Sequence, residues 1–389
     1  MRRALAALIA LALAVGTASC APTYASGYQE ALAKGLAAKN AGRYDEAIAA
    51  LEKAADLGER YKDRDEARYV AGTIYEKLEK WAEASATYGR VAIESGGRYQ
   101  GVRSEFARAR VEQEHIDRTR GDALMVEAVK KHPDSGLARH AVRRMLEPIE
   151  RDAGPDAAIQ FLHQFTEVAK GTDLDEELLY EEGLVLFRAK RHEAARDVLV
   201  ASARNHPYPL GALTDDALYQ AALCEEALGD YDAALALLVE LLSPMESAYA
   251  GSSYERPRFP EAQYRIAMIW LTRKHDRARA KKELRKMHDE HHASRFVDDA
   301  LWLEGRLELA DGERDAACDS MEKIGSLIQG GDAPRSRFLR CLNLICPEIA
   351  AADKPCADYI ARELPNDPEK DVIEVTGPVP LPQESRFTE

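Results

Sequence analysis

One short pattern recurs along the chain and constrains its fold more than any other feature. It reads Gly-Arg-Tyr-Asp-Glu-Ala at residues 42–47 and returns at 79–84 and 229–234, each time with an aromatic third residue. Weaker copies stand at 190–195 and 312–317, and a small residue precedes each copy by seven positions. These small residues are Gly35, Gly72, Gly183, Ala222 and Gly305. Each copy is therefore a turn between two helices that the small residue lets approach closely.

The spacing of the copies sets the number of helical hairpins. Most intervals lie near 37 residues, and the long gap from Asp65 to Glu176 equals three such periods, which predicts two weaker units inside it. The eight predicted units begin near Tyr28, Asp65, Ser104, Arg139, Glu176, Asp215, Glu261 and Asp298. The alternative is a non-repeating helical bundle with alanine-rich packing, which does not explain turns at near-integral multiples of one period.

The pattern resembles the tetratricopeptide repeat (TPR), a helix–turn–helix unit of 34 residues. This resemblance implies an all-α fold over residues 28–331, a right-handed TPR-like solenoid of about eight hairpins in which each hairpin contacts mainly its neighbours. The stretch Ser-Arg-Phe-Val-Asp-Asp-Ala-Leu-Trp at 294–302, echoed by Asp-Asp-Ala-Leu-Tyr at 215–219, is similar to periodic variants in two envelope proteins. They are the outer-membrane assembly lipoprotein BamD and the Tol–Pal-associated periplasmic protein CpoB.

The resemblance also implies a partner-binding groove, because the second, fifth, ninth and twelfth positions of each first helix face the concave side in this family. Aromatic and arginine side chains at such positions are the types enriched at binding hot spots, and a groove of this kind suits a peptide or a partner helix. The predicted groove residues are Tyr69, Arg108, Arg143, Tyr180, Phe187, Tyr219, Arg265, Trp302 and Arg306. The alternative is that these side chains pack between neighbouring helices.

The first twenty residues predict export and a lipid anchor. Two arginines, a short apolar stretch and small residues read as a signal peptide over 1–19, and Ala-Ser-Cys at 18–20 resembles the bacterial lipobox. That resemblance implies acylation (palmitate) of Cys20, a tether over 20–27 and a place on the periplasmic face of the outer membrane, since Ala21 is not the Asp that marks inner-membrane retention. An ordinary signal peptide and a soluble periplasmic protein are the alternative.

The net charge of the chain indicates which class of partner to expect. The formal net charge is −14, and it becomes −16 once the signal peptide with Arg2 and Arg3 is removed. Nucleic-acid affinity arises mainly from Lys and Arg on phosphates, so no nucleic-acid partner is expected. No apolar run reaches the ~20 residues of a spanning helix. We therefore expect envelope protein partners and a membrane contact through the lipid alone.

The cysteines and the tail mark the C-terminal region. Cys318, Cys341, Cys346 and Cys356 cluster where the repeat fades, which predicts one or two disulfides that staple a helical cap over 332–365, with a zinc site as the rival. Cys224 reads as a small buried residue. Residues 366–389 are predicted to be a disordered tail, and the run Pro-Val-Pro-Leu-Pro at 378–382 could alternatively be a polyproline ligand for a partner.

No catalytic motif, metal site or cofactor site is predicted. The one pattern that needs checking is His-Asp-Glu-His-His at 288–292, which imitates a zincin motif with Asp289 in place of the usual glutamate. The sequence therefore predicts a non-enzymatic, lipid-anchored scaffold of the bacterial envelope, with outer-membrane protein assembly as the process that the resemblance suggests. The alternative is an envelope metal-dependent hydrolase that uses His288 and His292.

Overall fold

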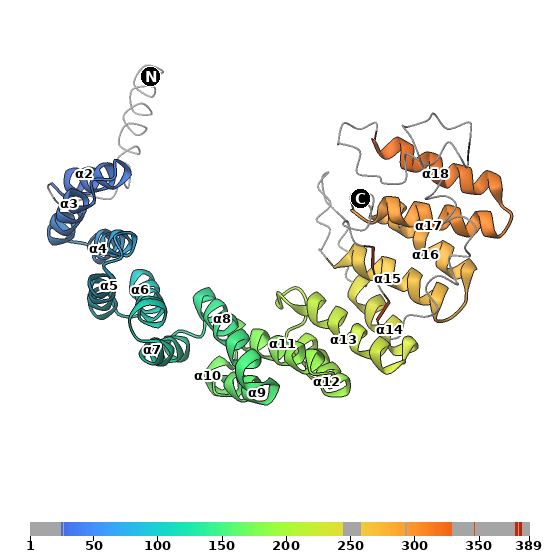
Figure 1. The fold of residues 1–389 in the computed structure, drawn as a ribbon, viewed down its shortest axis with the longest axis horizontal. Coiled ribbons are helices and arrows are strands. Elements are labelled where there is room, and N and C mark those ends of the chain that lie inside the picture. The colour runs from blue at the N-terminus through green and yellow to red at the C-terminus, as the bar shows by residue number, and fades with distance from the viewer. Residues whose placement is uncertain are drawn as a thin grey trace, which may run out of the picture. The chain divides into compact units, whose positions relative to one another are not determined.

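The computed structural model describes residues 25, 27–243, 258–291, 294–328, 346, 378–379 and 381–382. In these residues the regular secondary structure consists of α-helices and one π-helical turn (Figure 1). Consecutive helices contact one another from α2 to α7 and from α10 to α18, and the predicted all-α solenoid is confirmed. The chain divides into two compact units, Met1–Met145 and Leu146–Glu389, which are described separately below.

The first unit is a run of helical hairpins. It comprises α2 (Tyr28–Asn40), α3 (Tyr44–Leu57), α4 (Tyr61–Lys77), α5 (Trp81–Ser95), α6 (Tyr99–Val111), the π-helical turn η1 (Glu112–Ile116) and α7 (Arg118–Lys131). The pairs α2–α3, α4–α5 and α6–α7 form three hairpins, and each hairpin also contacts the next. Helix α8 (Gly136–Ala153) follows and carries the boundary between the units.

The second unit continues the same architecture. Its helices are α9 (Pro155–His163), α10 (Thr166–Ala169), α11 (Asp173–Arg188), α12 (His192–Asn205), α13 (Thr214–Leu228), α14 (Tyr231–Leu242), α15 (Phe259–Thr272), α16 (Arg277–Glu290), α17 (Val297–Ala310) and α18 (Arg314–Ile328). From α11 to α18 every helix contacts its predecessor and its successor. The core therefore runs along the stack, and the largest cluster joins side chains from α11 to α17.

The predicted small residues are where the two helices of a hairpin meet. A Cβ added at Gly72 would lie 2.5 Å from Cε1 of Tyr88, and one at Gly183 would lie 2.4 Å from Cγ of Leu199. The partner is sixteen residues further along in both cases. The same separation joins Gly35 to Leu51 and Gly305 to Met321. A large side chain in the second helix fills the space that glycine leaves in the first, which is the close approach that the repeat predicted.

The turns between paired helices share one backbone conformation. A residue with positive φ follows the first helix in six hairpins: Gly42 (74°), Glu79 (57°), Lys190 (60°), Gly229 (84°), His275 (52°) and Gly312 (82°). The next amide then donates back into the helix, as from Lys80 N to Tyr75 O at 2.9 Å and from Arg191 N to Leu186 O at 2.9 Å. This left-handed helix ending suits glycine, so its three non-glycine positions are conformationally strained.

The structure differs from the predicted array at its weakest repeats. The boundary between the two compact units falls within α8, inside the range 28–331 that the sequence predicts as the solenoid. Pro148 lies inside that helix, where it lacks an amide hydrogen for the helical ladder. The preceding hairpin also departs from the repeat, because the π-helical turn η1 intervenes between α6 and α7. Both irregularities fall in the two units that the sequence predicts from the spacing of the repeats alone.

Several predictions concern residues outside the described ones. These are the signal peptide 1–19, Cys20, most of the 20–27 tether, His292, and the 332–365 cap except Cys346. The tail 366–389 is described only at residues 378, 379, 381 and 382. Among the described residues, no helix combines the length and the apolar character that crossing a membrane requires.

Candidate functional site

The candidate site is a buried polar group on the first helices of two neighbouring hairpins. Tyr219 and Glu226 lie seven residues apart on α13, so two helical turns place them on one face, and Arg265 lies opposite on α15. Arg265 donates from Nη1 to Glu226 Oε1 at 2.8 Å and from Nε to Tyr219 Oη at 3.1 Å. We call Tyr219, Glu226 and Arg265 the Glu226 site.

Burial dominates the electrostatics of the Glu226 site. The side chains of Glu226 and Arg265 are 0% and 6% exposed, so their ion pair is shielded from solvent. This burial raises the pKa of Glu226 above its ordinary value, while Arg265 opposes the rise. Burial likewise raises the pKa of Tyr219, which therefore stays a neutral phenol. The guanidinium of Arg258 lies 5.1 Å from the Tyr219 ring centroid and adds a second cation at the edge of the site.

A segment from the far end of the sequence completes the site. The backbone amide of Val379 donates to Glu226 Oε2 at 2.7 Å, although the two residues are 153 positions apart. Val379 is 1% exposed and belongs to the apolar cluster of α11–α17, and Leu381 packs against the same cluster. Residues 378–379 and 381–382 are drawn in dark red in Figure 1, near the helix labelled α15. Both oxygens of the Glu226 carboxylate are therefore used, one by Arg265 and the other by Val379.

The arrangement holds a short segment of the same chain by one main-chain amide and two apolar side chains. A carboxylate fixed by an arginine presents one oxygen to a main-chain amide, and the neighbouring apolar surface takes side chains two residues apart, as an extended chain presents them. In the sequence 378–382 every second residue is proline, which favours this extended form and removes amides that would otherwise need partners. The solenoid therefore contacts both the backbone amide of Val379 and the side chains of Val379 and Leu381.

The structure places two of the predicted groove residues of the second unit in the Glu226 site and two more in the large apolar cluster. Tyr219 and Arg265 form the Glu226 site itself, and the half-buried Phe187 packs against the same cluster as Val379. Tyr180 is also a member of that cluster and is 8% exposed. Tyr180, Tyr219 and Arg265 are buried and Phe187 is half-buried. Partner binding by these side chains stays a prediction.

Trp302 and Arg306 on α17 lie apart from the Glu226 site. Trp302 is 4% exposed and belongs to an apolar cluster with Val297, Leu301, Cys318 and Cys346, so the structure places it in the packing of the last hairpin. Arg306 is 9% exposed and is likewise buried.

The first unit holds the remaining predicted groove residues. Tyr69 is half-buried, with its ring centroid 5.3 Å from that of Tyr88 and the Arg103 guanidinium 4.2 Å from its own. Arg108 is half-buried and lies 3.4 Å from where a Cβ on Gly89 would stand. Arg143 on α8 is exposed. Arg143 therefore remains accessible to a partner, whereas Tyr69 is held in an aromatic and cationic stack.

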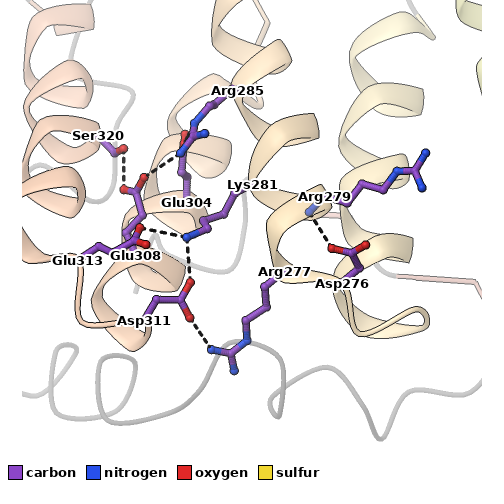
Figure 2. A network of polar contacts seen from close by, with 10 residues as sticks. All are labelled: Asp276, Arg277, Arg279, Lys281, Arg285, Glu304, Glu308, Asp311, Glu313 and Ser320. Carbon is purple, nitrogen blue, oxygen red and sulfur yellow. Dashed lines mark hydrogen bonds and ion pairs between the residues drawn. The ribbon is translucent and has the colours of Figure 1, made fainter.

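The histidine candidate lies in a structural ion-pair network. His288 on α16 has Nδ1 2.9 Å from Asp289 Oδ1 and Nε2 3.5 Å from Glu304 Oε2. Figure 2 shows two other side chains of α16 that donate hydrogen bonds to acidic residues: Arg285 donates to Glu304 and Glu308 of α17, and Lys281 donates to Asp311 and Glu313. Among the described residues, no three His, Cys, Asp or Glu side chains are grouped to hold a metal ion. No observation therefore supports the hydrolase alternative.

The structure describes two of the four clustered cysteines, Cys318 and Cys346. Cys318 on α18 forms a disulfide with Cys346, so the last hairpin is tied to a residue 28 positions further along. Cys341 and Cys356 lie outside the described residues. Cys224 is a buried free thiol on α13, and burial raises its pKa to about 12.

Sequence reasoning passed over the two residues that make the site distinctive. Glu226 occupies the twelfth position of its unit, which is a groove position in the tetratricopeptide pattern. The groove prediction named only aromatic and arginine residues and therefore omitted it. Val379 lay in a tail that was predicted to be disordered. A signal for each existed, namely an acidic groove position opposite Arg265 and an alternating Pro-Val-Pro-Leu-Pro run.

Comparison with known proteins agrees with the geometry. A tetratricopeptide-repeat model matches residues 216–243, which cover nearly all of α13 and α14. No curated protein matches the chain significantly. Solved structures that it resembles include that of pilF from Pseudomonas aeruginosa, at 13% identity and a TM-score of 0.35, covering 61% of this chain and 97% of that one.

Two other solved structures carry the same kind of repeat. A tetratricopeptide repeat protein from Parabacteroides merdae shares 16% identity at a TM-score of 0.29, over 82% of this chain and 99% of that one. The TPR domain of P58(IPK) shares 15% identity at a TM-score of 0.24, over 79% and 94%. At such identities the likeness concerns the fold alone. The chain is an all-α solenoid that carries a tetratricopeptide repeat at residues 216–243.

Proposed function

We propose that this chain is a lipid-anchored, non-enzymatic scaffold of the bacterial cell envelope that holds an extended peptide of a partner protein at the Glu226 site. One observation carries the binding part of the proposal: Glu226 accepts the backbone amide of Val379 at 2.7 Å while Val379 is buried in the apolar cluster. A solenoid built from stacked hairpins offers such surfaces without a catalytic centre.

The anchor and the compartment are proposed from the first twenty residues. Cys20 follows small residues as in a lipobox, and an acylated cysteine would hold the −16 body to a membrane without help from surface charge. The periplasmic face of the outer membrane follows from Ala21, and outer-membrane protein assembly is the process that the resemblance to BamD favours. A Cys318–Cys346 disulfide suits an oxidising compartment such as the periplasm.

Fractionation of cells tests the anchor. The wild-type chain should enter the outer-membrane fraction and incorporate labelled palmitate, whereas Cys20→Ala should do neither. Ala21→Asp is the matched variant, because it keeps the cysteine and should move the protein to the inner membrane. Recovery of Cys20→Ala in the membrane fraction at the wild-type level would refute the lipid anchor.

Site-specific crosslinking in cells tests the binding role. A photoreactive phenylalanine analogue in place of the half-buried Phe187, which packs against the cluster around Val379, should give an adduct with an envelope protein. The same analogue at the exposed Ala194, on the second helix of that hairpin, is the control and should give none. Adducts of equal yield at both positions, or none at Phe187, would contradict a partner site here.

A further inference from the structure

The segment that fills the Glu226 site belongs to the chain itself. Val379 contributes a buried side chain and a hydrogen-bonded amide, and Leu381 adds a second apolar contact on the same cluster. The last described helix of the solenoid, α18, ends at Ile328. The chain between Ile328 and Val379 is long enough for Val379 to reach back to α13. The site is therefore occupied by an internal peptide with the features of a ligand.

We propose that residues 378–382 are an intramolecular ligand that competes with the partner peptide for the Glu226 site. This inference rests on the proposed function, because it assumes that a partner uses the same site. The partner segment would share the chemistry of the internal one: an extended, proline-flanked stretch with a free amide on one apolar residue and a second apolar side chain two residues later.

Few described contacts hold the tail segment to the solenoid. Its polar link to the solenoid among the described residues is the one amide on Glu226, and its described apolar contacts come from two side chains. A covalently attached segment acts at an effective concentration of about 1 mM, so weak intrinsic affinity is enough to keep the site closed. A partner at high local concentration can then displace it.

The amide contact sets the chemical requirement for any competitor. Glu226 is 0% exposed and its other oxygen is engaged by Arg265, so a competitor that lacks an amide at this position would leave a buried carboxylate oxygen without a donor. A peptide with proline at that position should therefore bind poorly, however apolar its flanks. Proline is suited to the flanking positions 378, 380 and 382, and an amide-bearing residue to position 379.

Binding of the tail peptide to full-length protein tests the proposal. The probe is a fluorescein-labelled synthetic peptide of residues 375–385. The double variant Val379→Asp/Leu381→Asp weakens the internal segment and should bind the probe about 10–100-fold more tightly than wild type, in proportion to the lost effective concentration. The control Gln383→Asp/Ser385→Asp adds the same charge outside the segment and should bind like wild type.

A change in the probe tests the Glu226 contact without altering the protein. A peptide that is N-methylated on the residue equivalent to Val379 cannot donate, and it should bind the double variant at least 10-fold more weakly than the unmodified probe. A peptide N-methylated at Gln383 is its control and should bind normally. Equal binding of the two methylated peptides, or equal affinity of wild type and double variant for the unmodified probe, would overturn the proposal.

Two further readouts keep the outcomes separate. Thermal melting of the double variant shows whether the solenoid remains folded, and light scattering of the wild type shows whether the tail acts within one chain. A wild-type dimer that the double substitution dissociates would overturn the intramolecular proposal in favour of a second copy. A crosslinked envelope partner at Phe187 that is insensitive to the tail would reject this inference and leave the proposed function standing.

Discussion

Replacing Gly72 by Ala gives the sharpest test of the packing that builds the hairpins. The added Cβ would lie 2.5, 2.9 and 3.0 Å from three ring atoms of Tyr88. The ring cannot give way easily, because Tyr88 is 0% exposed and its hydroxyl is hydrogen-bonded to Glu76 Oε1 at 2.5 Å. We therefore expect Gly72→Ala to destabilise the α4–α5 hairpin even though alanine is the better helix former.

The expected change in the free energy of unfolding is the balance of two opposing effects, overpacking and helix preference. Overpacking a well-filled core costs about 1–3 kcal/mol, and a rigid ring with three close atoms favours the upper half of that range. Alanine in a helix interior recovers about 1 kcal/mol relative to glycine. The free energy of unfolding of the hairpin should therefore fall by about 1–2 kcal/mol.

Gly89→Ala is the matched control on the facing helix. The nearest atoms to its new Cβ belong to the Arg108 side chain at 3.4–3.5 Å, which is ordinary contact. This variant should gain about 0.5–1 kcal/mol from helix preference alone. Urea unfolding of the full-length chains, with hydrogen exchange of α4 and α5 amides, measures both changes. If Gly72→Ala stabilised the hairpin as much as Gly89→Ala, the close approach would not hold and the packing argument would fail.

Four further predictions test other parts of the structure. Lys190→Gly should raise the free energy of unfolding by about 0.5–1 kcal/mol in urea titrations, because Lys190 has positive φ, while Lys190→Ala should not. Burial raises the pKa of Glu308 above its ordinary 4.5, so its stabilising contribution is complete below that pH and is lost as pH rises through the raised value. Glu308→Gln should therefore make the unfolding free energy of α17–α18 fall less between pH 4.5 and 8. Cys318→Ser, which opens the loop to Cys346, should cost about 3 kcal/mol and lower the melting temperature of the last hairpin. The thiol of Cys224, with its pKa of about 12, should react with iodoacetamide at pH 8 only after denaturation, as peptide mass mapping would show.

The hairpin architecture could be predicted because its determinants are local and repeated. A small residue at position 72 or 183, a turn seven residues later and a large partner sixteen residues later all fall within one repeat. The observed first helices begin within a few residues of the predicted units, for example at Tyr28 and Thr214. Repetition made these short patterns visible even where single copies such as 190–195 are weak.

The candidate site could not be predicted to the same extent because its contacts span distant parts of the chain. Nothing near Glu226 in sequence indicates that the amide of Val379, 153 residues away, will approach it. Position within a repeat predicted that Tyr219 and Arg265 share a face. It could not predict that both would be buried, since burial depends on what covers that face.

The buried ion pair itself argues that the Glu226 site is for recognition. Removing two charges from water is costly, and well-packed apolar residues at the same positions would generally serve stability as well or better. A second task for the carboxylate would explain this cost, and here its other oxygen accepts a hydrogen bond from the main-chain amide of Val379, 153 residues away. Arg265 then acts as a positioning residue that opposes the burial-driven rise in the pKa of Glu226 and orients its carboxyl group. Arg265→Met should accordingly reduce probe binding in the tail-disrupted background more than it changes the apolar packing, and an unchanged affinity would assign the pair to the core alone.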